Sequence, residues 1–328
     1  MQDAFGRRVD YLRISVTDRC NMRCHYCMPE AGLPFFDRED VLTYAEIVAF
    51  VREVAVPLGV TRLRLTGGEP LVRRDLHLLA GRLAELPAIQ DLALTTNGVL
   101  LASQAEALRQ AGVTRLNVSL DSLRPERFRH ITRGAELARV WAGLEAAEAA
   151  GFAPLKLNCV VMRGFNEDEV ADFAALTLEH PWHVRFIEFM PVGDHALFEQ
   201  VGYVPTEEVQ ARIRARFTLE PLARPDVPGH GPARYWRIPG AMGSVGFISQ
   251  MSHDFCEACN RVRLTSDGRL RHCLLSDHEL DVRSLLRGGV DPGAIREAIV
   301  ADLQLKLERH QGAAGIASHR RSMSQVGG

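Results

Sequence analysis

Short apolar runs alternate with amphipathic stretches along the first two thirds of the chain. Six runs have the length and composition of strands: YLRISV, RLRLT, DLALTT, RLNVSL, LKLNCVV and VRFIEFM. Apolar residues recur at helical spacing over residues 47–58, between the first two runs, and over residues 137–147, before the fifth. Gly59, Gly112 and Gly151 stand where such helices would end. Strands in strict alternation with helices predict an α/β fold with a parallel sheet.

The pattern changes after about Gly193. A helix is expected over residues 207–217, followed by the stretch ARPDVPGHGPA, whose prolines and glycines are typical of a loop. Beyond it, the runs YWRI, SVGFIS, VRLT and RLRHCL indicate a small β-rich unit, with a hairpin turn at residues 266–268. We therefore predict a first domain over residues 1–195 and a second over residues 196–328.

The end of the chain carries one further helix pattern. It begins at Pro292, a residue that suits the first helical turn, and runs to about Arg309. The last stretch, SHRRSMSQVGG, has few apolar residues, so we do not expect it to pack as an element.

Composition narrows the class of protein. The 39 Lys and Arg residues nearly balance the 41 Asp and Glu residues, so a net charge of −2 gives no field suited to nucleic acid. No apolar run reaches the roughly 20 residues of a membrane span, and the start has no apolar core like that of a secretory signal. We expect a cytoplasmic protein. Seven cysteines in a reducing compartment then indicate metal or redox chemistry rather than disulfides.

The first group of cysteines, Cys20, Cys24 and Cys27, follows the first predicted strand in the string CNMRCHYC. A cubane iron-sulfur cluster usually has four cysteine ligands, so three leave one iron open to another ligand. Radical chemistry with S-adenosylmethionine uses such an iron. The alternative is a zinc site completed by His25 or a distant residue.

This spacing, with Tyr26 before the last cysteine, resembles the signature of the radical S-adenosylmethionine superfamily. A second feature of that superfamily is TGGEP, residues 66–70, at the end of the second predicted strand. Glycines let the main chain approach a ligand closely, and exposed peptide groups there can bind the methionine amino group.

The second group of cysteines is Cys256, Cys259 and Cys273, in the string CEACNRVRLTSDGRLRHCL. A zinc ribbon is one interpretation, and its fourth ligand would come from His253, His272 or His278. Beside a radical motif upstream, an auxiliary 4Fe-4S cluster with an open iron is favoured.

Arg261 and Arg263 lie just after Cys259, and residues two apart on a strand point to the same side. Guanidinium groups bind phosphate oxygens in bidentate fashion, so the pair suits a nucleoside triphosphate lying between the two clusters. A solvated basic strand is the alternative.

Taken together, CNMRCHYC, TGGEPLVRRDL, TTNG, NVSLDS, RFIEFMPVG, CEACNRVRLTSDG and the final Gly-Gly resemble the GTP 3′,8-cyclase family, from about residue 8 onward. The resemblance implies a partial (βα)6 TIM-like barrel of the radical S-adenosylmethionine type, which carries the first 4Fe-4S cluster. A smaller C-terminal α+β domain would close the barrel with the second cluster.

The resemblance also implies site residues. The contacts to S-adenosylmethionine would be Tyr26, Gly68, Ser119 and Met190. Those to GTP would be Arg13, Arg64, Thr95, Lys156, Arg261 and Arg263, with Arg185 a weaker candidate. Catalysis would involve Arg13, Arg261, Arg263 and the tail residues Gly327 and Gly328. These positions lie on successive predicted strands, and we expect them to meet on one barrel face. Cys159, outside both groups, is expected in the core.

The activity implied is that of a lyase, which converts GTP to 3′,8-cyclo-7,8-dihydro-GTP in the first step of molybdenum cofactor (molybdopterin) biosynthesis. A homodimer and a downstream cyclic pyranopterin monophosphate synthase are also implied, whereas the electron donor is not. A radical peptide maturase is one alternative, although such enzymes generally carry more C-terminal cysteines. A protein with two structural zinc sites is the other.

Overall fold

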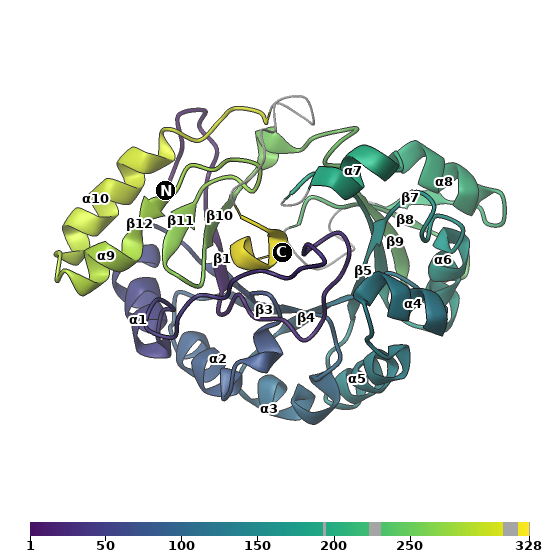
Figure 1. The fold of residues 1–328 in the computed structure, drawn as a ribbon, viewed down its shortest axis with the longest axis horizontal. Helices are drawn as coiled ribbons and strands as arrows, with labels where there is room; N and C mark the ends of the chain where they lie inside the picture. Colours follow the sequence, from purple (N-terminus) through teal and green to yellow (C-terminus); the bar gives the residue numbers. More distant parts are fainter. Residues whose placement is uncertain (193–194, 223–230, 311–320, 328) are drawn as a thin grey trace.

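The computed structural model describes residues 1–192, 195–222, 231–310 and 321–327, and in them twelve strands form one curved sheet (Figure 1). From one edge to the other, the strands are β12 (Leu280–Asp281), β11 (Arg269–Arg271), β10 (Arg261–Leu264), β1 (Tyr11–Ser15), β2 (Arg62–Thr66), β3 (Asp91–Thr96), β4 (Arg115–Ser119), β5 (Lys156–Val161), β6 (His183–Glu188), β9 (Ser244–Ile248), β8 (Arg234–Arg237) and β7 (Glu220–Leu222).

The six strands β1 to β6 are parallel and follow one another in chain order. They coincide with the six apolar runs of the sequence, so the predicted parallel sheet of the first part of the chain is confirmed. Their short apolar stretches are buried because helices cover one side of the sheet and side chains fill the other. The carboxyl ends of all six strands therefore open toward one side of the molecule.

Helices surround this sheet, and Figure 1 shows α1 to α6 along its outer side. The helices are α1 (Tyr44–Phe50), η1 (Val51–Ala55), η2 (Pro70–Val72), α2 (Leu76–Ala84), η3 (Leu101–Ser103), α3 (Ala105–Gln110), α4 (Pro125–Thr132), α5 (Leu137–Ala149), α6 (Val170–Glu179), α7 (His195–Val201), α8 (Thr206–Arg214), η5 (Cys256–Ala258), α9 (Val282–Arg287), α10 (Pro292–Leu303) and α11 (Met323–Val326). Gly59, Gly112 and Gly151 have φ values of +88°, +88° and +82°, as expected for residues that end helices.

The C-terminal strands continue the barrel sheet at both edges. Strand β10 pairs in parallel with β1, and β9 pairs in parallel with β6. Core residues from the two parts, such as Leu12 and Val262, belong to one buried apolar cluster. In the described residues, the strands expected beyond residue 195 thus share a sheet and a core with the first part.

The predicted hairpin is confirmed, since β10 and β11 are antiparallel around residues 265–268. Two strands were missed because β7 has three residues and β12 has two, which is too short for an alternating pattern. Helix α10 begins at Pro292 as predicted but ends at Leu303, not near Arg309. Beyond it the chain turns inward and buries Lys306, which is 3% exposed.

The tail differs most from expectation. Residues 323–326 form α11, which begins with a capping box between Ser322 and Gln325. Val326 is buried, and Arg321 forms an ion pair with the buried Asp267 at 2.8 Å. Figure 1 shows this short yellow helix near the centre of the molecule. The prediction that this stretch would not pack was wrong for residues 321–327, because polar contacts replace the missing apolar area.

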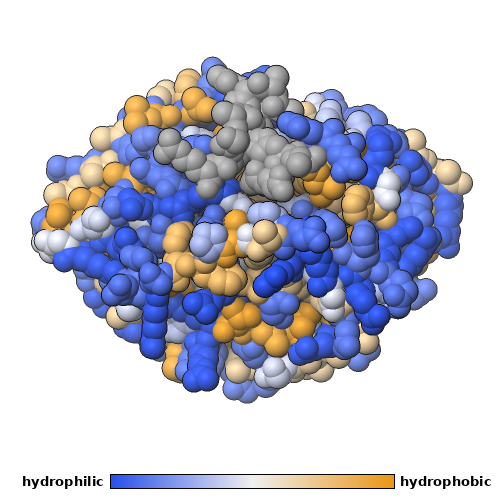
Figure 2. All heavy atoms as spheres, in the orientation of Figure 1, coloured by the Kyte–Doolittle hydropathy of each residue, from blue (hydrophilic) through white to orange (hydrophobic). Residues whose placement is uncertain are grey.

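Figure 2 shows hydrophilic residues over most of the same face, interrupted by separate apolar patches. Within the described segments, no helix is both long and apolar enough to cross a membrane.

Candidate functional site

A cavity lies at the carboxyl ends of the parallel strands, and both parts of the chain line it. Most of the predicted site residues meet there: Arg13, Cys20, Cys24, Tyr26, Cys27, Arg64, Gly68, Thr95, Ser119, Arg185, Met190, Cys256, Cys259, Arg261, Arg263 and Cys273. Three predicted residues do not line it: Lys156 lies lower on its strand, Gly327 follows the lining residues Met323 and Ser324, and Gly328 is outside the described residues.

The first cysteine triad lies on the loop that follows β1. Burial raises the pKa of the Cys20 thiol to about 11 and that of Cys27 to about 12. The Cys20 sulfur accepts a hydrogen bond from the amide of Met22 at 3.4 Å. Thiolates are disfavoured in such surroundings unless a cation accompanies them, so the triad is suited to a metal rather than to free thiolate chemistry.

The TGGEP segment anchors this loop. A side chain at Gly67 would place its Cβ 2.6 Å from the Thr17 carbonyl oxygen, and one at Gly68 would place it 2.5 Å from that of Arg19. The Gly68 amide also donates to the Thr17 carbonyl at 2.7 Å. The glycines therefore permit a close approach to the protein's own chain, where the sequence predicted an approach to a ligand.

Glu69, in the same segment, was not singled out from the sequence. Its buried carboxylate accepts from the Thr96 hydroxyl and the Asn97 amide, both at 2.7 Å, and from the Leu71 amide at 3.0 Å. Burial raises its pKa to about 7 despite these donors. Thr96 and Asn97 belong to the TTNG string. The contact between TGGEP and TTNG could therefore have been predicted only once β2 and β3 were known to be neighbours.

Asp121 was also missed, although it lies in the string NVSLDS. Its Oδ2 accepts a hydrogen bond from the Tyr26 hydroxyl at 2.9 Å, and its Oδ1 accepts one from the Val160 amide at 2.9 Å. Burial raises the pKa of Asp121 to about 6. The carboxyl group thereby fixes the Tyr26 ring against the wall of the cavity.

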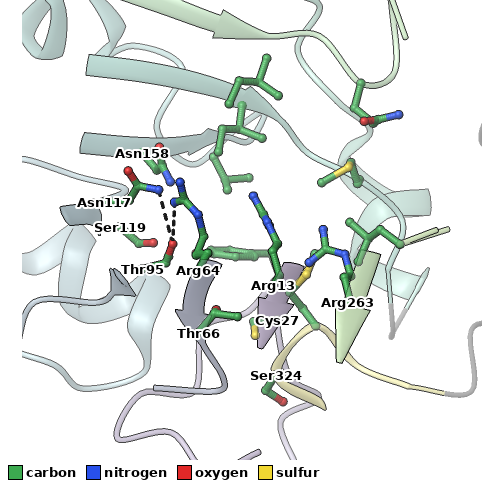
Figure 3. Close-up of a pocket in the computed structure, with 18 of the residues that line it drawn as sticks. Arg13, Cys27, Arg64, Thr66, Thr95, Asn117, Ser119, Asn158, Arg263 and Ser324 are labelled. Atoms are coloured by element: carbon green, nitrogen blue, oxygen red, sulfur yellow. Dashed lines mark hydrogen bonds between the residues drawn. The ribbon is translucent and has the colours of Figure 1, made fainter. Parts of the chain in front are cut away.

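Three arginines stand in a row across neighbouring strands. Arg13 on β1 is in register with Arg64 on β2 and with Arg263 on β10. Figure 3 shows their side chains side by side and directed toward the same space. Arg64 also donates from Nη1 to the Thr95 hydroxyl at 3.0 Å. The row joins two strands of the barrel to one strand of the C-terminal part.

These cations are crowded and poorly compensated. Burial and the neighbouring Arg263 and Arg64 guanidinium groups hold the pKa of Arg13 well below its usual value. Burial, and then Arg261, lower the pKa of Arg263 to about 9. Among the described residues, Arg13 Nε and Arg185 Nε have no hydrogen-bond partner. Buried cations without counter-charges are costly, so the cavity is suited to an anionic ligand.

Lys156 lies at the amino end of its strand, away from the cavity. It is two residues before Asn158 on β5, and Asn158 rather than Lys156 lines the cavity. Burial, followed by Arg185, lowers the pKa of Lys156 to about 6. Arg185, the weaker candidate from the sequence, is the residue whose side chain reaches the wall.

The second cysteine triad faces the same cavity from the C-terminal part. Cys256 is the first residue of η5, Cys259 directly follows η5, and Cys273 follows β11. Burial opposes ionisation of Cys259, but Arg261 and Lys306 outweigh it and lower its pKa to about 7. Burial raises the pKa of Cys256 to about 11.

The spacing of the sulfur atoms distinguishes a single ion from a cluster. Tetrahedral zinc would hold three sulfurs about 3.8 Å apart. In the part of the chain that the structure describes, the groups of three potential ligand atoms within 4.8 Å of one another are Asp254–Cys256–His310 and His272–His278–Asp302. Neither is a cysteine triad. In each triad at least one pair of sulfur atoms is therefore farther apart than a single zinc ion would hold them.

The tail closes one side of the cavity. Arg263 donates from Nη1 to the Gly327 carbonyl, and Ser324 lines the cavity below the arginine row (Figure 3). Gly327 has a φ of +77°, and a Cβ there would lie 2.9 Å from Cγ2 of Thr66. Glycine is therefore required at this position for both its backbone angle and its lack of a side chain.

Comparison with known proteins agrees with this geometry. Residues 14–177 match the family model of the radical S-adenosylmethionine superfamily, and residues 182–312 match that of Molybdenum Cofactor Synthesis C. The fold is similar to SuiB of Streptococcus suis bound to the precursor peptide SuiA, with a TM-score of 0.62 at 14% identity over 90% of this chain and 70% of that one. The fold and the first triad thus define a radical S-adenosylmethionine enzyme.

Curated relatives narrow the assignment. GTP 3′,8-cyclases of Moorella thermoacetica and Pelotomaculum thermopropionicum are 48% and 50% identical, each over 100% of both chains. That of a Cyanothece strain is 52% identical over 98% of this chain and 99% of its own. The chain belongs to the GTP 3′,8-cyclase family, as its motifs predicted.

Proposed function

We propose that this cavity performs the reaction of the family, the cyclisation of GTP to 3′,8-cyclo-7,8-dihydro-GTP, the first step of molybdenum cofactor biosynthesis. The observation that carries the proposal is the row of buried arginines, Arg64, Arg13 and Arg263, in a cavity lined by two cysteine triads. The triphosphate group of a nucleotide would supply the negative counter-charge for these buried guanidinium groups.

The first triad would hold a 4Fe-4S cluster through Cys20, Cys24 and Cys27. When bound and reduced, such a cluster would supply the electron that cleaves S-adenosylmethionine, and with it the radical chemistry needed to activate the 3′ C–H bond of the ribose. The chain's own contribution is to position the cofactor. Tyr26, fixed by Asp121, lines the wall beside this triad, and Gly68, Ser119 and Met190 are the further contacts that we propose.

The second triad would hold a second 4Fe-4S cluster through Cys256, Cys259 and Cys273, with one iron free to bind the guanine ring. Its place across the cavity from the first triad supports a substrate lying between the two. The proposed GTP contacts are Arg13, Arg64, Thr95, Arg185, Arg261 and Arg263, with Lys156 on β5 as a buried amine whose pKa is lowered to about 6. Rigid positioning matters because the radical must meet one hydrogen among many.

For the tail, we propose that it holds Arg263 in place through the Gly327 carbonyl. Appending a residue after Gly328 is expected to abolish turnover while leaving iron and sulfide content unchanged. Full activity of that variant would remove the tail from the mechanism.

The central test uses GTP deuterated at the ribose 3′ position, incubated anaerobically with S-adenosylmethionine, a reductant and the reconstituted protein. Deuterium should appear in 5′-deoxyadenosine, and mass analysis should show the cyclised nucleotide. A peptide maturase would transfer no deuterium from GTP. A structural zinc protein would be colourless and contain no sulfide, so the same preparation separates all three interpretations.

We also propose a homodimer and a downstream cyclic pyranopterin monophosphate synthase, both on the strength of the family alone. Light scattering of the reconstituted protein tests the dimer, for which a monomeric mass at micromolar concentration would be contrary evidence.

We propose two domains that meet at about residue 195. The two family models support a division in this region, because one ends at residue 177 and the other begins at residue 182.

A further inference from the structure

Lys306 is a buried lysine near the second cysteine triad. The residue is 3% exposed, and its ammonium donates to the carbonyls of His272 and Arg261, the second at 3.4 Å. Among the described residues, no carboxylate forms an ion pair with it. The sequence pattern predicted that Lys306 lies inside the helix that begins at Pro292.

The two carbonyls place this ammonium between the segments that carry the cysteines. His272 directly precedes Cys273, and Arg261 is two residues after Cys259. Arg7 makes a similar contact from the N-terminal segment, because its Nη1 donates to the Cys256 carbonyl at 2.8 Å. The difference is that Arg7 has an acidic partner, Asp3, at 2.6 Å.

A buried ammonium bound only to carbonyls is incompletely compensated. Removing such a charge from water costs several kcal/mol, and neutral acceptors return only part of it. The missing counter-charge must be an anion close by. Because the ammonium binds the carbonyls of residues next to Cys273 and near Cys259, a cluster held by the three thiolates would supply negative charge at that place.

We propose that Lys306 is a positioning residue that raises the reduction potential of the second cluster. The reduced cluster carries one more negative charge than the oxidised cluster, so a nearby buried cation stabilises the reduced form. This inference rests on the second cluster proposed above. The electron comes from the added reductant, and no bond in the protein forms or breaks.

The first triad supplies an internal contrast. Two buried carboxylates lie beside it: Glu69 accepts from the main-chain amide of Asn97, whose side chain contacts Cys20 Sγ at 3.8 Å, and Asp121 accepts from the hydroxyl of Tyr26, the residue before Cys27. Acidic neighbours disfavour the reduced form of a cluster and lower its potential. The second cluster should therefore be reduced at a less negative potential than the first.

The test is a redox titration of the anaerobically reconstituted full-length protein, followed by electron paramagnetic resonance. Lys306→Gln keeps donors for the carbonyls and removes the charge, whereas Lys306→Arg keeps the charge. We expect Lys306→Gln to shift the potential of the second cluster to more negative values and to leave the first unchanged. Lys306→Arg should stay close to the unaltered protein. Arg309→Gln, which removes an exposed charge paired with Glu257, is the control and should shift neither.

The outcomes separate this inference from the function itself. An unchanged reduction potential of the second cluster in Lys306→Gln overturns the inference. Loss of the second cluster from both variants also overturns it, because a positive charge, which Lys306→Arg retains, would then not be what the cluster requires. Loss from Lys306→Gln alone supports it, since the cluster would then depend on the cation. An unaltered protein with a single cluster would instead refute the proposed function.

Discussion

The two cysteine triads line one cavity but are built in opposite ways. The first lies within eight consecutive residues of a single loop, and burial makes its thiols hard to ionise. The second combines a turn with a segment beyond a hairpin, and the cations Arg261 and Lys306 favour the Cys259 thiolate. One site depends on local chain geometry, whereas the other depends on contacts between distant segments.

This difference indicates how the cavity is divided. The end near the first triad has neutral and acidic neighbours, including Asp121 and Glu69, and is suited to the cationic sulfonium of S-adenosylmethionine. The row of arginines, Arg64, Arg13 and Arg263, is suited to an anionic substrate, and it lies between the first triad, beyond the carboxyl end of β1, and Cys259, just before β10. We therefore expect charge to order the two ligands, with S-adenosylmethionine beside the first triad and the anionic substrate along the arginine row.

Removal of one cysteine from each triad should give the largest difference between the two triads. In Cys24→Ala, we expect no 5′-deoxyadenosine and no cyclised nucleotide, because the first cluster is lost. In Cys259→Ala, we expect 5′-deoxyadenosine to form without cyclised nucleotide. Chromatography of both products after single turnover measures this. Cyclised product from Cys259→Ala would show that the second triad is dispensable.

The role of the arginine row in binding GTP can be tested by changing Arg13. Arg13→Met removes a charge-assisted contact worth about 2–3 kcal/mol, so GTP should bind roughly 30- to 150-fold more weakly. Equilibrium binding in the absence of reductant measures the change. Arg62→Met is the matched control, because Arg62 pairs with Asp10 at 2.8 Å outside the cavity. Equal losses in the two variants would contradict the assignment.

The buried lysine outside the cavity, Lys156, predicts a pH dependence of stability. Burial lowers the pKa of Lys156 to about 6, so between that pH and its usual pKa the unfolded chain binds the extra proton. The free energy of unfolding therefore rises with pH across this range. In Lys156→Met, the gain from about pH 6.5 to 8.5 should be smaller by roughly 1–3 kcal/mol. Urea unfolding of cluster-free protein tests this, and parallel pH profiles would refute it.

The smallest effect is expected for Tyr26→Phe. The change removes the hydrogen bond to Asp121, worth about 1 kcal/mol, so the KM for S-adenosylmethionine should rise roughly fivefold while the KM for GTP stays constant. Tyr44→Phe removes an exposed hydrogen bond to the Arg74 carbonyl and should change neither constant. A change in the GTP constant alone would reverse the proposed order of ligands.

The strands and the cysteines could be predicted from the sequence because both depend on short-range patterns. The six barrel strands follow apolar runs, and each triad is visible as a spacing. Residues that act across the fold were missed, namely Glu69, Asp121, Lys306 and Arg7. Their roles arise from neighbours on other elements, which no local pattern reveals.

Depth along a strand was a second source of error. Lys156 and Arg185 both lie on strands whose ends open to the cavity, but only Arg185 reaches it. The sequence places both on the correct strands without fixing their height relative to the ligand. The tail escaped prediction for a related reason, because its packing depends on Arg321, Arg263 and Asp267 rather than on apolar content.

The pairing of β1 with β10 has a consequence for synthesis on the ribosome. Tyr11 emerges early, but its partner Arg261 is translated only after about four fifths of the chain. At typical translation rates, one edge of the nascent sheet stays unpaired for on the order of 10 to 50 seconds. Unpaired edges invite association with other chains, so slow growth or abundant chaperones should favour soluble expression.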